Sequence, residues 1–158
     1  MENFPQVAQA LQTLNGSVAG LNAAIQGGTQ SDAGQVRVQM AADQVKQSLK
    51  YLNNCKSSIE EHPDEYQDDA KKNASGPCSG QIVASLSALA QGIENAHESF
   101  PDNVASELKS VLEEFEKVQS SWEQLAQDNG ASADNHYPGL LPRLPQHLDG
   151  AFEKLGGR

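Results

Sequence analysis

Apolar residues recur at alternating three- and four-residue steps in four long stretches of this chain. Because an α-helix has about 3.6 residues per turn, such steps place the apolar side chains on one stripe of a helix. Stripes of this kind are typical of the buried seams of helix bundles and coiled coils. The four stripes are, in chain order, Val7, Leu11, Leu14, Val18, Leu21 and Ile25; Val38, Ala42, Val45, Leu49 and Leu52; Ile82, Leu86, Leu89, Ile93, Ala96 and Phe100; and Val104, Leu108, Val111, Phe115, Val118, Trp122 and Leu125.

Capping and breaking residues indicate where these helices begin and end. Gly27 and Gly28 end the first helix, because glycine accepts the left-handed backbone found at helix C-termini. Ser31 or Asp32 can cap the second helix by accepting its unpaired N–H groups, and Pro101 separates the third helix from the fourth. The predicted helices span residues 5–26, 32–58, 80–99 and 102–127, with a polar, acidic insertion over 60–79.

A fifth, short helix is predicted over residues 145–155, near the end of the chain. Pro145 is tolerated in a first helical turn, and Leu148, Phe152 and Leu155 continue the three- and four-residue steps. This helix is expected to pack on one end of the bundle or to cover a groove.

The fold class that follows is all-α, with residues 1–158 forming a single domain. Short connections between the first and second helices, and between the third and fourth, force each pair to lie antiparallel. The predicted architecture is therefore an antiparallel up-down four-helix bundle with a short C-terminal fifth helix. Two arrangements fit: one chain with a long connection through 60–79, or two hairpins that complete a bundle as a dimer. The single chain is simpler, because its four seams already close a core.

The formal net charge of −10 narrows the class of partner. Nucleic-acid binding and anionic membrane binding both depend on clustered lysine and arginine, so neither is predicted. No apolar run approaches the roughly 20 residues that a transmembrane helix requires, so no transmembrane segment is predicted.

Cys55 and Cys78 flank the acidic insertion, at the same end of two helices. A disulfide between them would close the insertion into a loop, a restraint worth about 3 kcal/mol. Such a bridge is typical of an oxidising compartment, whereas two unrelated thiols would fit a cytosolic protein. We predict the bridge.

Two features of the sequence bear on the compartment of the protein. Asn73, followed by Ala74 and Ser75, fits the pattern of an N-glycosylation site. The N-terminus lacks the basic and apolar regions of a signal peptide, which fits a cytosolic protein or a secreted protein supplied without its signal. The cysteine pair and Asn73 slightly favour secretion.

No metal site, cofactor or catalytic centre is predicted. The carboxylates between Glu60 and Asp69 lack the spacing of a calcium-binding loop. Glu94 and His97 form one Glu-x-x-His motif, but di-iron bundles need that motif on two helices. The chain also lacks the glycine-rich and nucleophile motifs of common enzyme classes, so it is not expected to be an enzyme.

The aromatic residues suggest an alternative use of the core. Trp122 and Phe115 fall on the seam of the fourth helix and are expected to pack there. They are also candidates for the wall of an apolar ligand pocket near the C-terminal end of that helix. Phe100, Leu141 and Phe152 are the candidates that would close the pocket.

The segment from Val18 to Val38 has the order helix, Gly27-Gly28, helix. In this order the segment resembles the start of fungal secreted hydrophobic-surface-binding and cell-wall mannoproteins. The resemblance implies a helical bundle, and some members of that group hold fatty acids between the helices. The cysteine pair and the acidic insertion depart from that group.

The function predicted from the sequence is non-enzymatic recognition of another protein, through a helix face or through the insertion. The alternative is carriage of an apolar small molecule, a fatty acid or sterol, between the helices. A carrier needs a sizeable apolar cavity between its seams, whereas an interaction module has a filled core and an exposed patch.

Overall fold

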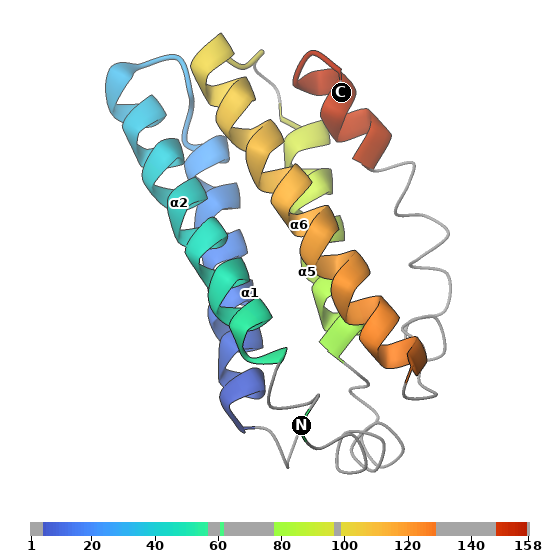
Figure 1. Ribbon diagram of the computed structural model, residues 1–158. Coiled ribbons are helices and arrows are strands. Elements are labelled where there is room, and N and C mark those ends of the chain that lie inside the picture. Colours follow the sequence, from blue (N-terminus) through green and yellow to red (C-terminus); the bar gives the residue numbers. More distant parts are fainter. Residues whose placement is uncertain (1–4, 57–60, 62–77, 97–98, 129–147, 158) are drawn as a thin grey trace.

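The computed structural model describes residues 5–56, 61, 78–96, 99–128 and 148–157 (Figure 1). This part of the chain is helical and contains no strand, which confirms the all-α prediction. A short helix over 148–154 follows the long ones. The long helices are α1 (Pro5–Gln26), α2 (Asp32–Asn54), α5 (Cys78–Glu94) and α6 (Asp102–Asp128).

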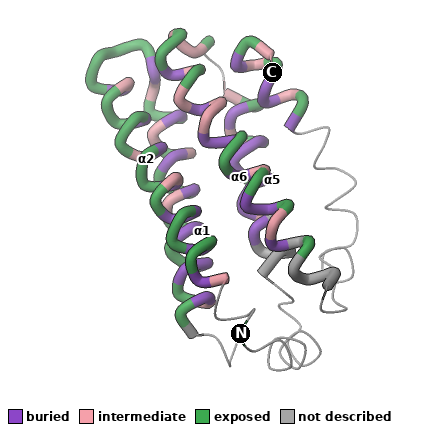
Figure 2. Tube along the Cα trace, in the orientation of Figure 1, coloured by how far each residue is buried: buried purple, intermediate pink, exposed green. Residues whose placement is uncertain are grey.

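The four long helices lie side by side around one apolar core (Figure 1). Helix α1 packs against α2 and α5, and α6 packs against the same two helices. Each helix therefore has two neighbours, and buried residues recur along each helix (Figure 2).

The residues of the predicted stripes form this core. From Val7 to Trp122, every stripe residue within a described helix is at most 7% exposed. The side chain of Leu125 lies outside the described residues. Ala96 and Phe100, the last two residues of the third stripe, follow the end of α5 and are only partly buried.

The capping predictions for the connection between α1 and α2 are confirmed. Helix α1 has the predicted bounds, and Gly28 adopts the left-handed backbone with φ of +101°. Ser31 caps α2, where its Oγ accepts a hydrogen bond from the Gly34 N–H at 3.0 Å.

Two predicted helix ends are too late. Helix α2 ends at Asn54 rather than at 58, where the Cys55 N–H is shared between the carbonyls of Tyr51 and Leu52 at 3.1 Å each. Helix α5 ends at Glu94 rather than at 99. There the Ala96 N–H bonds three residues back, to the Ile93 carbonyl at 3.2 Å, and this tighter turn ends the helix.

The C-terminal helix packs on the same core, beside the end of α5. Leu148, Ala151, Phe152 and Leu155 belong to the buried cluster. Lys154 Nζ donates a hydrogen bond to the carbonyl of Ala96 at 2.7 Å. A cation at that position satisfies a carbonyl left unpaired at the end of α5.

Candidate functional site

Charge is distributed unequally between the helices of this bundle. Helix α1 has no charged residue, and α5 has one, Glu94. Helices α2 and α6 carry charges of both signs, and Lys46 of α2 pairs with Glu107 of α6 at 3.0 Å. The bundle thus has an uncharged side, α1 with α5, and a charged side, α2 with α6.

Hydrogen bonds between neutral groups join α1 to α5 on the uncharged side. Ser85 Oγ of α5 donates to Asn15 Oδ1 of α1 at 2.6 Å. Asn22 Nδ2 of α1 donates to the carbonyl of Ala88 at 3.4 Å. The helices of this side are therefore held by apolar packing and by amide and hydroxyl hydrogen bonds.

Helix α2 separates its exposed residues into two stripes. Asp32, Asp43, Lys46 and Lys50 are spaced so that they share one side of the helix. A second set, spaced by four, four, three and four residues, contains no charge itself and shares another side, on which Arg37 also lies, three residues before Met40. This set is Val36, Met40, Gln44, Gln47 and Tyr51.

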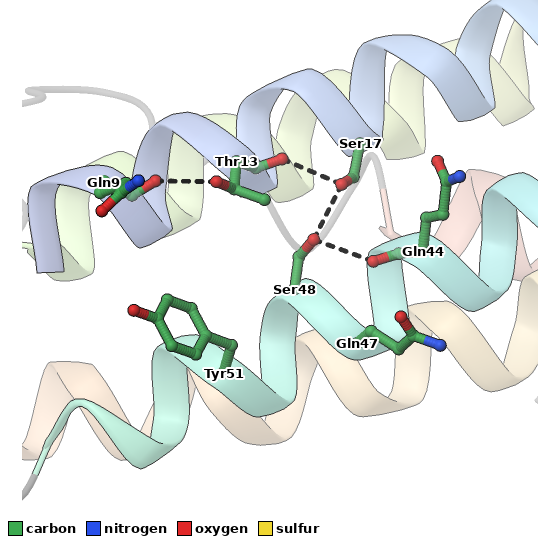
Figure 3. A pocket seen from close by; sticks show the side chains of 7 residues that line it. All are labelled: Gln9, Thr13, Ser17, Gln44, Gln47, Ser48 and Tyr51. Atoms are coloured by element: carbon green, nitrogen blue, oxygen red, sulfur yellow. Dashed lines mark hydrogen bonds between the residues drawn. The ribbon is translucent and has the colours of Figure 1, made fainter. Parts of the chain in front are cut away.

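The uncharged stripe of α2 borders α1, and an open groove of about 560 Å³ lies between them (Figure 3). In Figure 3, Tyr51 and Gln47 extend from α2 on one side, and Gln9 lies on α1 opposite. The groove is lined by Gln9, Thr13, Ser17, Gln44, Gln47, Ser48 and Tyr51.

Hydroxyl groups fix the centre of this groove. Ser17 Oγ of α1 and Ser48 Oγ of α2 lie 2.8 Å apart, which joins the two helices. One of these hydroxyls donates its single proton to the other, and the accepting hydroxyl donates to a carbonyl of its own helix at 2.9 Å, that of Thr13 for Ser17 or that of Gln44 for Ser48 (Figure 3). Each hydroxyl oxygen keeps acceptor capacity toward the groove.

A second open groove of about 430 Å³ adjoins the first through their shared residue Gln44. Small residues of α1, Gly20 and Ala23, form one side, and Met40 of α2 forms the other. Arg37 is the one charged residue that lines either groove.

Together these residues make one continuous surface, which we call the uncharged face. It consists of the exposed residues of α1 and the uncharged stripe of α2. The α1 residues are Gln6, Gln9, Gln12, Thr13, Asn15, Gly16, Ala19, Gly20, Ala23 and Gln26.

A hollow of about 720 Å³ lies at the other edge of α1, beside the end of α5. Its polar lining is again neutral, with Asn22, Gln26, Gln91 and Asn95 among its residues. Asn22 Oδ1 is buried there without a hydrogen-bond partner. None of the described side chains that line this hollow is titratable.

The predicted ligand-pocket residues are not brought together. Phe115, Trp122 and Phe152 are at most 2% exposed and fill the core. Trp122 lies near the C-terminal end of α6, whereas Phe100 precedes its N-terminus, about 30 Å away along the helix. Phe100 lines the hollow beside α5, and Leu141 lies outside the described residues.

The predicted disulfide and glycosylation sites fall partly outside the described residues. Cys55 is buried, and no bridge to it is found among the described residues. Burial raises the pKa of the Cys55 thiol, and a hydrogen bond with the Tyr51 side chain opposes this rise. The side chain of Cys78 and the whole of Asn73 lie outside the described residues.

No group of three or more His, Cys, Asp and Glu residues in the described part of the chain is arranged to hold a metal ion. None of the described helices combines the length and hydropathy that crossing a membrane requires.

Comparison of the chain with protein-family models, with curated proteins and with solved structures finds no match. The resemblance of the Val18–Val38 segment to fungal secreted proteins therefore gains no support from these comparisons.

The uncharged face was not predicted from the sequence, although the sequence contains one signal for it. The absence of charge from residues 5–26 can be read directly from the sequence. The grooves cannot be predicted from the sequence, because they depend on how α1 and α2 pack together.

Proposed function

We propose that this chain is an antiparallel up-down helix bundle that recognises another protein through its uncharged face. The single observation that carries this proposal is that no exposed position of α1 is charged. Charged residues make up 20% of the chain, so a helix of 22 residues without one is a marked departure. Interface centres are depleted in charged residues, because charges are costly to remove from water.

The shape of the face also favours a protein partner. Helix α1 is about 33 Å long, and its two grooves are open along the side rather than enclosed. The exposed large apolar residues of the described chain, Val36, Met40 and Tyr51, all lie on α2 beside it. An extended face with scattered apolar side chains suits a broad contact better than a small molecule.

Carriage of a fatty acid or sterol has less support. An apolar ligand needs an enclosed apolar cavity. The stripe residues within the described helices are at most 7% exposed and pack against one another in one cluster. The two grooves beside α1 and α2 include polar residues, and so does the hollow beside α5, although seam residues such as Ile25 and Phe100 also line it.

Site-specific photo-crosslinking tests this function. A photoreactive amino acid replaces Gln12 on the exposed side of α1 and, as the matched control, Glu113 on the exposed side of α6. In extracts of the source cells, the Gln12 variant should form a discrete protein adduct that is absent from the Glu113 variant. Equal labelling at both positions, or none at Gln12, would contradict the proposal.

A further inference from the structure

We infer that the partner of the uncharged face is a second copy of this chain, so that two copies pair face to face about a twofold axis. This inference rests on the proposed function and names the class of partner. Three properties of the face support this inference: its charge, its hydrogen-bonding groups and its shape.

Charge limits where two copies can meet. Each copy carries a formal charge of −10, so most contacts between copies bring like charges together. Helix α6, for example, exposes Glu113 and Glu114 side by side. The residues that define the uncharged face carry no formal charge, and the one charged side chain that lines its grooves, Arg37, is positive. Two acidic copies can therefore approach on this face with less repulsion than on the charged side of α2 and α6.

The polar groups of the face are complementary to themselves. Glutamine, serine and threonine side chains each contain a donor and an acceptor, so an identical residue can satisfy them across a twofold axis. Carboxylates accept only, and ammonium groups donate only, so they cannot pair with copies of themselves. Gln9, Gln12 and Gln47 provide such amides on the exposed side of the face.

The shape of the face is also complementary to itself. Met40 of α2 is 61% exposed and stands beside a shallow groove whose opposite side includes Gly20. A Cβ built on Gly16 or on Gly20 meets no atom within 4 Å, so each glycine leaves open space. In a twofold pair, the projecting residue of one copy can fill the space beside glycine in the other, as an isologous interface requires.

The face is large enough for a stable pair. The 22 residues of α1 extend for about 33 Å, and two packed helices are about 20 Å wide. The projected area is therefore about 600 Å² per copy, close to the roughly 800 Å² of accessible surface that each partner buries in a standard interface.

Sedimentation velocity of the full chain tests the inference. The wild-type chain should sediment with twice its mass of 16.9 kDa at high concentration and dissociate on dilution. Gly20→Glu fills the open space in which Met40 of the other copy would pack and puts a carboxylate into the contact, where it must lose water, so association should weaken at least tenfold. The open space at Gly20 means that this substitution creates no clash within one copy, and circular dichroism checks that the variant is folded.

Gln39→Glu is the matched control, since it adds the same charge to an exposed position of α2 outside the uncharged stripe. It should leave association unchanged relative to wild type. Higher salt should strengthen wild-type pairing, because it screens the repulsion between acidic copies and an uncharged interface has no ion pairs to lose. Should Gly20→Glu fail to fold, Gln12→Glu replaces it.

The outcomes separate this inference from the proposed function. A wild-type chain that stays monomeric, or a dimer that Gly20→Glu and Gln39→Glu weaken equally, overturns pairing through this face. If the chain is monomeric but the Gln12 crosslinker captures a different protein, self-pairing is wrong and the proposed function stands. If the chain is monomeric and no adduct forms, both are wrong.

Discussion

Gly92 of α5 lies so close to Asn22 of α1 that a Cβ on Gly92 would overlap the Asn22 carboxamide. The absent side chain lets α1 and α5 approach, and it leaves room for the Asn22 amide between them. In this position Asn22 Nδ2 reaches the carbonyl of Ala88 at 3.4 Å. The close approach of α1 to α5 and the hydrogen bond from Asn22 to Ala88 therefore depend on each other at this pair.

Gly92→Ala should therefore have opposite effects in two backgrounds. In a helix interior, alanine is about 1 kcal/mol more favourable than glycine. In the wild-type chain the new Cβ must displace the Asn22 amide and break its hydrogen bond, a loss of about 1 kcal/mol or more. We expect no gain, or a net loss, in the free energy of unfolding measured with urea.

In an Asn22→Ala background the same Gly92→Ala substitution should raise the free energy of unfolding by about 1 kcal/mol. Gly16→Ala, whose Cβ meets open space, is the control and should stabilise the chain in both backgrounds. Measurements belong at a protein concentration where the chain is monomeric. The same effect of Gly92→Ala in both backgrounds would show that the overlap has no energetic consequence.

Truncation of seam residues should show that the core is filled. Leu86 and Leu108 are both 0% exposed. Replacing either by alanine leaves a cavity, so the free energy of unfolding should fall by about 2–5 kcal/mol. Met40→Ala, at an exposed position, should change it by less than about 0.5 kcal/mol. A loss near zero at Leu86 or Leu108 would mean that the seam at that helix is loosely packed.

The predicted bridge between Cys55 and Cys78 can be tested by peptide mapping without reductant. In protein from an oxidising compartment, both cysteines should occur in one linked fragment. Reduction should then lower the melting temperature by several degrees, since about 3 kcal/mol of chain restraint is lost. Free alkylation of both thiols in such protein would count against the bridge.

With both thiols reduced, the buried position of Cys55 predicts a dependence of stability on pH. Because burial raises the pKa of this thiol, the unfolded chain loses the proton at a lower pH than the folded chain. The stability linked to Cys55 is therefore fully present below the unfolded thiol pKa and is lost as pH rises toward the folded value. Urea midpoints for wild type and Cys55→Ala should converge or cross above about pH 9. If the urea midpoints of the two proteins changed with pH in parallel, this linkage to Cys55 would be contradicted.

The parts of the fold that could be predicted from sequence are those that local chemistry determines. The Ser31 cap and the left-handed Gly28 follow from side-chain and backbone preferences, and they place the end of α1 and the start of α2 correctly. The end of α5 was missed, because the seam spacing continues to Phe100 after the helix has ended. Spacing records which residues can face the core, and it does not record whether the backbone between them stays helical.

The candidate site was less predictable than the fold. Phe115 and Trp122 were considered for a ligand pocket, but in a closely packed bundle such residues fill the interior. The groove joined by Ser17 and Ser48 depends on the packing of α1 on α2, which no local pattern specifies. The sequence does show that α1 lacks charged residues. The structure adds that the outer side of α1 borders the uncharged stripe of α2.

The C-terminal helix is expected to stabilise the bundle as part of its core. A helix over 148–154 is too short to be stable alone, so its packing must hold it in place. Phe152 is 2% exposed, and Phe152→Ala should lower the free energy of unfolding by about 3–5 kcal/mol. Lys154→Met removes the hydrogen bond to the Ala96 carbonyl and should cost about 1 kcal/mol. Glu153→Gln, at an exposed position, is the control and should change stability by less than about 0.5 kcal/mol. If Phe152→Ala left stability unchanged but increased the binding of an apolar fluorescent probe, the helix would instead be a removable cover over an apolar site.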